Sequence, residues 1–345
     1  MNDLNVKNSI PKGTWINSQN KYEIINNKLY AELYDNSGLI HKRTIKINND
    51  FTYCNTNGNF CIEKFNNTLF IIVCNQLGNC LRVITSCIII AEYYKMNVFI
   101  DMDKIYLDNK DNEVIRKLFP SLCIYNNNFN YPLLKYNDYV IYEKMHCTNY
   151  NLINEGRFYK PTNINNFGIN FNIYSIIPND MSNETYIKKK IKIYQSLKWP
   201  DFLLKDVENF LSRFNLSTFI SFHIRFTDNL TELSKKSFNT PIEIFIAKLE
   251  SYNNMNILIC SDNKDLIRQF KNKKNKNNNL IFANQCSNVD FQHLYEMFLL
   301  SKTNLIIGSN SSTFSYESAF IEGTDIELYE NNEWKLYKLG DYKQV

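Results

Sequence analysis

The first 67 residues alternate short apolar segments with turns rich in Asn, Gly and Asp. Apolar and polar positions alternate with a period of two in residues 22–24, 28–33 and 44–47, which is the pattern of half-buried strands. Turn sequences such as Asn26-Asn27 separate these segments. This part of the chain is therefore expected to form a small antiparallel sheet.

The hydrophobic pattern changes at residue 68, where continuous apolar runs begin to alternate with segments of helical periodicity. Such alternation predicts a parallel sheet covered by helices on both faces. Residues 125–178 are rich in Asn and Tyr and show only one clear strand. The expected strands of this part are 69–74, 97–100 and 139–142, and the expected helices are 80–95 and 111–118.

A second series of the same kind follows two amphipathic helices at 181–197 and 201–214. The sequence therefore predicts an α/β fold with two Rossmann-like domains, 68–200 and 201–345, preceded by the β segment 1–67. The two domains should face each other across a cleft. The last strand of the second series should close its sheet. The expected strands are 218–222, 256–260, 280–283, 304–307 and 326–329. The expected helices are 241–251, 290–301, 313–320 and a helix that follows the turn 261–263 and runs through 270.

Composition agrees with a globular chain, since 345 residues with 44% hydrophobic content can form real cores. A net charge of +4 and lysines that are scattered apart from two runs argue against a nucleic-acid partner. The amino terminus has no apolar core of the kind that a signal peptide needs, and the longest apolar run, 83–91, is too short to cross a bilayer. Nine irregularly spaced cysteines, several within apolar runs, favour reduced thiols. A soluble, cytoplasmic protein is expected.

Polar residues crowd the end of the expected strand 218–222, where His223, Arg225 and Asp228 follow one another. Ligands of open α/β sheets bind outside the carboxyl ends of the strands, so this cluster is placed to meet a substrate. Pairing of Arg225 with Asp228 in solvent is the alternative. A second polar turn, Ser311-Ser312-Thr313, opens the expected helix 313–320. Its hydroxyls, backbone N–H groups and helix dipole suit a phosphate, and the same residues would also serve as a helix cap.

Four segments occur in one order and spacing: 77–82 (LGNCLR), 223–228 (HIRFTD), 260–262 (CSD) and 290–319 (DFQHLYEMFLLSKTNLIIGSNSSTFSYESA). Together they resemble the GDP-fucose-dependent fucosyltransferases, namely their α-1,2-linking, α-1,6-linking and O-linking groups. The resemblance covers residues 68–330 and implies two Rossmann-like domains of the GT-B type. It further implies an inverting, metal-independent enzyme that moves fucose from GDP-fucose to a glycan hydroxyl. A different nucleotide sugar, or a carbohydrate-binding protein with a degenerate transferase domain, is the alternative.

Arg225 is expected at the diphosphate, because its planar fork can bridge two phosphate oxygens whose charge grows as the glycosidic bond breaks. By the resemblance, Glu296 accepts the guanine N–H groups; a solvated helix residue is the alternative. His223 contacts the nucleotide or ribose, or else it is a buried structural histidine. Gly78 lets its turn approach the pyrophosphate or acceptor closely, and Asn79 hydrogen-bonds that group.

An inverting transfer also needs a base for the acceptor hydroxyl. Asp228 and Glu232 follow the strand and are the candidates. Asp262, in the third segment, is a further candidate or donor contact, with a structural turn residue as the alternative. The base proposed for the α-1,6-linking group falls on Leu233 here. The chain also departs from the family at Phe226, where a second arginine usually follows the first, which leaves the donor open.

Residues 1–67 carry a second set of ordered positions: Gly13, Ser18, Ile24, Leu29, Ala31, Gly38, Ile45, Ile47, Cys54 and 57–60. This order resembles one repeat of the cyanovirin-type lectins. The disulfide positions of that repeat are Gln19 and Leu33 here, and one repeat is present where those lectins use two. The segment is expected to bind sugar, to be a structural addition or to form a dimerisation sheet. The expected partners are thus a nucleotide sugar, a glycan acceptor and a second copy of the chain, with no metal or other cofactor.

Overall fold

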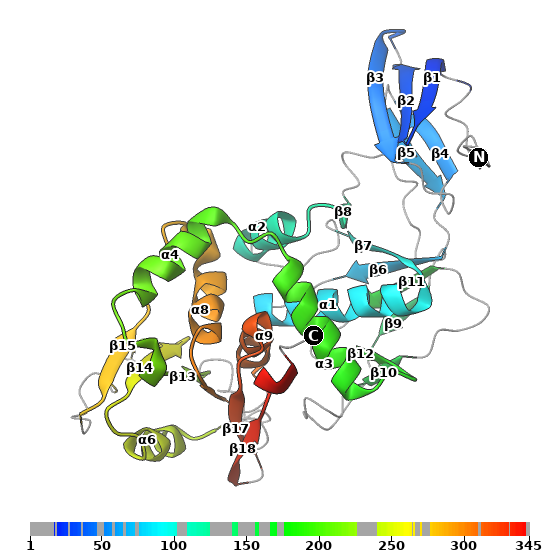
Figure 1. The fold of residues 1–345 in the computed structure, drawn as a ribbon. Helices are drawn as coiled ribbons and strands as arrows, with labels where there is room; N and C mark the ends of the chain where they lie inside the picture. Colours follow the sequence, from blue (N-terminus) through cyan, green and yellow to red (C-terminus); the bar gives the residue numbers. More distant parts are fainter. Residues whose placement is uncertain are drawn as a thin grey trace, which may run out of the picture.

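The computed structural model shows an α/β protein with a group of antiparallel strands at one end of the chain (Figure 1). It describes residues 17, 19–26, 28–35, 37–46, 52–56, 59–64, 67–72, 76–101, 109–124, 140–143, 156–158, 166–170, 176–225, 240–263, 265, 270, 277–309, 312–330 and 332–342.

The amino-terminal strands form the expected small antiparallel sheet. Strands β1 (Gln19–Ile25), β2 (Lys28–Tyr34) and β3 (Ile40–Lys46) pair in that order, and β4 (Thr52–Thr56) and β5 (Asn59–Lys64) form a separate hairpin. The period of two is plain in β2, where alternate apolar side chains are buried. Gln19 lies directly opposite Leu33, so the two positions that carry a disulfide in the lectin repeat are cross-strand neighbours here.

The next unit is a parallel sheet of five strands in the order β8-β7-β6-β11-β9. The chain builds one side of β6 first and then returns to its other side, so the strand order switches next to β6. Helix α1 (Leu77–Tyr94) leaves the sheet at this point. The other elements are β6 (Thr68–Ile72), β7 (Asn97–Asp101), α2 (Asn109–Leu118), β8 (Cys123–Ile124), β9 (Val140–Glu143) and β11 (Asn166–Asn170), with β10 (Gly156–Phe158) and β12 (Ile176–Pro178) paired separately.

Helices α3 (Asn183–Ser196) and α4 (Asp201–Leu211) lead to a second sheet, in the order β15-β14-β13-β16-β17-β18. All of its pairings are parallel except the last, β17 with β18. Its elements are β13 (Phe219–Ile224), α6 (Ile242–Glu250), β14 (Asn256–Ser261), β15 (Asn279–Phe282), α8 (Gln292–Ser301), β16 (Ile306–Gly308), α9 (Thr313–Glu322), β17 (Ile326–Glu330) and β18 (Glu333–Tyr337).

Three expectations about elements were wrong. Helix α1 begins at Leu77, three residues earlier than expected, so Gly78 and Asn79 lie in its first turn and not in a loop. Strand β13 runs on to Ile224 and includes His223. The segment 326–329 does not close its sheet, because the chain turns through Asn332 at a φ of +68° and adds β18 to that edge.

The two parallel sheets share one continuous hydrophobic core. A single cluster of buried side chains includes Leu69 of β6, Leu81 of α1, Leu258 of β14 and Leu328 of β17. Helices α1, α3 and α9 lie between the sheets, where α9 packs on both of the others. The two sheets are therefore joined along these three helices.

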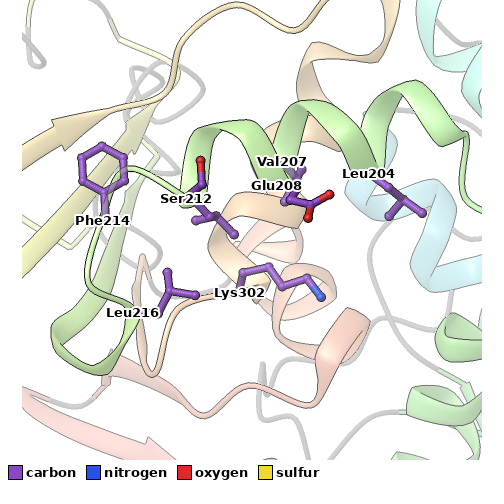
Figure 2. A pocket seen from close by; sticks show the side chains of 8 residues that line it. Leu204, Val207, Glu208, Ser212, Phe214, Leu216 and Lys302 are labelled. Atoms are coloured by element: carbon purple, nitrogen blue, oxygen red, sulfur yellow. The ribbon is translucent and has the colours of Figure 1, made fainter.

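A hollow of about 400 Å³ lies beside α4 (Figure 2). Phe214 and Leu216 line it just before β13 begins, and Lys302 lines it before β16. It therefore lies at the amino ends of these strands, opposite the edge at which a ligand is expected. Its other lining residues are Leu204, Val207, Glu208, Leu211 and Ser212.

Among the helices that the structure describes, none combines the length and apolar character needed to cross a membrane.

Candidate functional site

The second sheet has its switch in strand order between β13 and β16. Strands β14 and β15 extend one side of β13, and the chain then crosses to the other side to form β16. His223 lies at this boundary, paired with Cys260 of β14 and Gly308 of β16. Ligands of open α/β sheets bind in the crevice outside such a point. The expected cluster at the end of β13 therefore lies where the topology places a ligand.

His223 is held by the first turn of α9. Its Nδ1 lies 2.7 Å from Ser315 Oγ and 3.4 Å from Ser312 Oγ, and its ring stacks on Phe314 with centroids 4.7 Å apart. Gly308 makes room for this arrangement, since a Cβ there would lie 2.8 Å from Ser315 Oγ. The pairing of His223 with Ser315 was not predicted. Its only sequence signal is the spacing of Ser312 and Ser315, which places both on one side of a helical turn.

Burial keeps His223 uncharged. The side chain is 7% exposed, and its burial lowers the pKa to about 4, a shift that the Asp262 carboxylate opposes and the Arg225 guanidinium adds to. The imidazole is neutral at neutral pH. It can offer a hydrogen bond at this edge of the sheet but no charge.

Arg225 follows directly after β13 and is half-buried. Its backbone N–H donates to Ser309 Oγ at 2.9 Å, and the Ser309 N–H donates to the His223 carbonyl at 3.1 Å. The loop after β16 thus fixes the backbone from which the arginine side chain extends. The guanidinium of arginine is a cation, so Arg225 brings positive charge to the switch point.

Helix α9 begins with a hydrogen-bonded N-cap. Ser312 is the N-cap and is fully buried; its Oγ accepts from the Ser315 N–H at 3.4 Å. Thr313 is the first helical residue and is 4% exposed. The first turn contains no acidic residue, so the positive end of the helix dipole is not offset from within the helix.

The start of α1 meets the start of α9. A Cβ on Gly78 would lie 3.0 Å from the backbone nitrogen of Phe314 and 3.2 Å from the carbonyl carbon of Thr313. The close approach that Gly78 permits is therefore to the backbone of α9. The first turn of α1 also contains no acidic residue. Beside it, Asn79 is 8% exposed, and its Oδ1 has no hydrogen-bond partner among the described residues.

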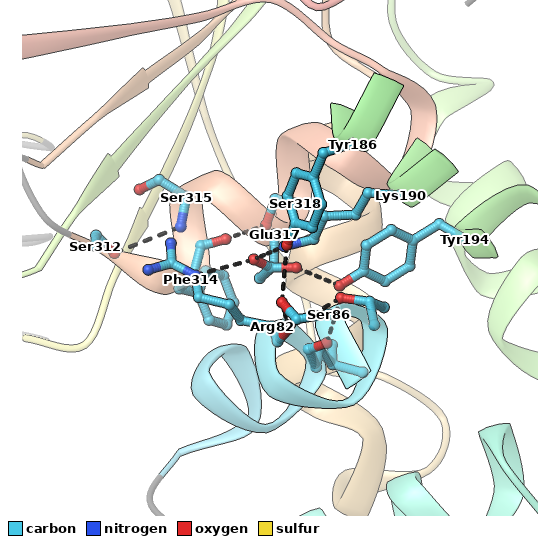
Figure 3. A network of polar contacts seen from close by, with 12 residues as sticks. Arg82, Ser86, Tyr186, Lys190, Tyr194, Ser312, Phe314, Ser315, Glu317 and Ser318 are labelled. Atoms are coloured by element: carbon cyan, nitrogen blue, oxygen red, sulfur yellow. Dashed lines mark hydrogen bonds and ion pairs between the residues drawn. The ribbon is translucent and has the colours of Figure 1, made fainter. Parts of the chain in front are cut away.

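A buried polar network ties these helices together around Glu317 of α9 (Figure 3). Arg82 of α1 donates from Nε to Oε1 at 3.2 Å, and Lys190 of α3 donates to the same oxygen at 2.7 Å. The Tyr194 hydroxyl of α3 donates to Oε2 at 2.5 Å. Burial, followed by the negative charge of Glu317, raises the pKa of Tyr194 well above its usual range. The sequence signal that was missed is Glu317 itself, a carboxylate placed among apolar and hydroxyl-bearing residues in the middle of α9.

Glu296 and Asp262 lie at the same edge of the sheet as His223. Glu296 is half-buried on α8 and accepts a hydrogen bond from Gln292 Nε2 at 2.8 Å. Burial raises the pKa of Glu296. The pKa of Cys260, the β14 residue opposite His223, is raised by burial and, to a smaller extent, by the negative charge of Glu296. Asp262 is exposed just beyond β14. Both carboxylates are thus near the switch point.

The remaining predicted site residues lie outside the described part of the chain. These are Asp228 and Glu232, the candidate bases, and Ser311 of the serine turn. Their roles stay predictions. Among the residues that the structure does describe, no three His, Cys, Asp or Glu side chains are grouped so as to hold a metal ion.

The chain matches no protein family model and no curated protein sequence. The solved structures that it resembles include fucosyltransferases. Fucosyltransferase NodZ from Bradyrhizobium is 12% identical with a TM-score of 0.49, over 78% of this chain and 98% of that one. FUT1 of Arabidopsis thaliana in complex with GDP is 14% identical with a TM-score of 0.45, over 77% and 71%. POFUT1 in complex with GDP is 9% identical with a TM-score of 0.40, over 74% and 94%. These are distant likenesses of overall arrangement, and the residue roles below rest on the chain's own motifs and geometry.

Proposed function

We propose that the chain is a glycosyltransferase of the GT-B type that transfers fucose from GDP-fucose to a glycan hydroxyl. The transfer inverts the configuration of the sugar and uses no metal ion. The acceptor oxygen attacks the anomeric carbon of fucose, the bond from that carbon to the diphosphate breaks, and GDP leaves with the bonding electron pair.

The observation that carries this proposal is the meeting of two helix N-termini beside Arg225. Helices α1 and α9 each start at the strand-order switch of their own sheet, and Gly78 lets the two starts touch. Neither first turn contains a carboxylate. Converging N–H groups, dipole ends and a guanidinium suit a diphosphate whose negative charge grows as it leaves.

We assign the following roles to the other site residues. Ser312 and Thr313, with Ser311, bind the diphosphate at the α9 start, and neutral His223 donates or accepts one hydrogen bond to the nucleotide. Glu296 accepts the N–H donors of guanine from the neighbouring helix, a pairing that a uracil ring would not offer. Asp228 or Glu232 removes the proton from the acceptor hydroxyl.

Nucleotide release from sugar nucleotides tests the proposal. Purified protein should release GDP from GDP-fucose, faster with a glycan acceptor, and should not release UDP from UDP-sugars. Arg225→Ala should lower turnover by about a hundredfold or more, because loss of one such donor costs about 3 kcal/mol in the transition state. Arg213→Ala is the matched control, since Arg213 is exposed beyond α4 and its guanidinium lies over the Phe210 ring.

Two outcomes would contradict the proposal. Complete loss of activity in EDTA, with recovery on adding a divalent metal, would exclude the metal-free mechanism. Absence of turnover with every nucleotide sugar, together with glycan binding that is lost on deleting residues 1–67, would favour a carbohydrate-binding protein.

A further inference from the structure

Within the described part of the chain, Arg225 is the one cation assigned so far to the proposed diphosphate site. His223 is neutral, and the residue after Arg225 is the uncharged Phe226. A leaving diphosphate carries at least two negative charges that must be met by positive charge or N–H donors. A second cation is therefore to be sought on the elements that contact the start of α9.

Arg82 is the cation that α1 brings to this place. Side chains on a helix point back toward its N-terminus, so Arg82 extends toward the first turn, where Gly78 touches Phe314. Its Cζ lies 5.3 Å from the centre of the Tyr316 ring, which fixes the guanidinium at the start of α9. Figure 3 shows the far end of this guanidinium pointing away from Glu317, toward the turn that holds Ser312 and Ser315.

The buried network fixes the direction in which Arg82 points. Arg82 and Lys190 both donate to Oε1 of Glu317, and both are at most 5% exposed. Glu317 therefore anchors the guanidinium through Nε, and the far end of the guanidinium lies on the side of the α9 start. Asn79 adds a buried Oδ1, without a partner among the described residues, that an N–H or hydroxyl of a ligand would satisfy.

We propose that Arg82 is the second cation of the diphosphate site, with Glu317 holding it by Nε so that its terminal nitrogens face the start of α9. This inference rests on the proposed function, and it names a residue that would compensate for the phenylalanine next to Arg225. Lys190 and Tyr194 position Glu317 from the opposite side and do not reach the ligand.

The test separates the charge of the nucleotide from its base. Isothermal titration measures binding of GDP, guanosine and inorganic pyrophosphate to wild-type protein and to Arg82→Gln, Arg82→Lys and Lys190→Met. Arg82→Gln should weaken GDP and pyrophosphate by about 10- to 100-fold and leave guanosine within about twofold. Arg82→Lys keeps a positive charge beside Glu317 and so protects the fold. Its shorter, single-point ammonium should still weaken GDP at least about tenfold relative to guanosine.

Lys190→Met is the matched control, because it removes the other cation from the same carboxylate oxygen. It should lower stability and leave the ratio of GDP to guanosine affinity unchanged. An unchanged ratio in folded Arg82→Lys would overturn the inference, as would an equal change in that ratio for Lys190→Met. If wild-type protein binds pyrophosphate but not GDP, the guanine assignment fails and the pyrophosphate affinities alone decide the role of Arg82. If it binds neither, both proposals fail.

Discussion

At the scale of single residues, the burial of His223 links folding to protonation. Its pKa falls from an ordinary 6.5 to about 4 in the folded protein because the charged form is desolvated. As pH falls, the unfolded chain therefore takes up a proton before the folded protein does. The stability that this histidine contributes is complete above pH 6.5 and is lost as pH falls toward the folded value.

We expect this loss to reach about 3 kcal/mol of unfolding free energy when the pH is lowered from 7 to 4. His223→Gln should reduce the pH dependence by that amount, as measured by urea unfolding at several pH values in this range. His293→Gln is the control, because the His293 side chain is 62% exposed on α8. Identical pH dependence in wild-type protein and His223→Gln would show that His223 is not buried in its neutral form.

At the scale of secondary structure, the contact between α1 and α9 depends on the absence of a side chain at Gly78. Replacement of Gly78 by Ala would favour the helix by about 1 kcal/mol from propensity alone. The added Cβ would however press on backbone atoms of α9, which cannot rotate away. Overpacking of this kind costs about 1–3 kcal/mol.

We therefore expect Gly78→Ala to lower the unfolding free energy by up to about 2 kcal/mol in spite of the better helix former. Urea unfolding would measure it. Lys95→Gly is the control at the other end of α1, where the C-cap has a left-handed φ of 53° that glycine adopts without strain. A Gly78→Ala variant more stable than wild-type protein by about 1 kcal/mol, the full gain in helix propensity, would mean that the helices can move apart at no cost.

The same contact shows what local patterns could and could not predict. Alternating apolar runs gave the parallel strands, because burial on both faces leaves a continuous signal. The start of α1 at Leu77 was missed, because residues 77–79 are helical through packing on α9. Strand β11 was missed as well: it has only two strongly apolar residues, Phe167 and Ile169, and its place is set by pairing with β6 and β9.

Local patterns likewise predicted one part of the candidate site and missed another. His223, Arg225 and Ser312 each lie in a short motif at the end of a strand or the start of a helix, so their meeting follows from the topology of a parallel sheet. The partners of Glu317 do not. Arg82 and Lys190 are 235 and 127 residues away from it in the sequence, and no spacing rule connects positions so distant.

At the scale of the whole molecule, Glu317 joins helices that belong to both sheets. Glu317→Gln would leave Arg82 and Lys190 buried without the carboxylate that both contact. We expect a loss of about 3–5 kcal/mol of unfolding free energy, measured by urea unfolding. Glu322→Gln is the control on the same helix, because its pair with Lys302 is partly exposed and should contribute less than about 1 kcal/mol. Equal effects would mean that the buried network does not hold the sheets together.

The amino-terminal strands are expected to be separable from the rest. The buried residues of β2, Leu29, Ala31 and Leu33, belong to none of the described hydrophobic clusters that unite the two parallel sheets. The last of these strands ends at Lys64. Asn67, by contrast, is part of the first parallel sheet, since its side chain donates to the Lys95 carbonyl at 2.7 Å and its carbonyl accepts from the Asn97 N–H at 2.9 Å.

A chain that starts at residue 65 should therefore fold, unfold in one transition and bind GDP within about twofold of the full-length affinity. Thermal unfolding and titration with GDP would measure this. A chain that starts at residue 70 is the matched control: it lacks Asn67 and the first two residues of β6, a central strand, and should unfold at a lower temperature. If both truncations destabilise the protein equally, the amino-terminal strands are part of the transferase fold, and the division at residue 67 is wrong.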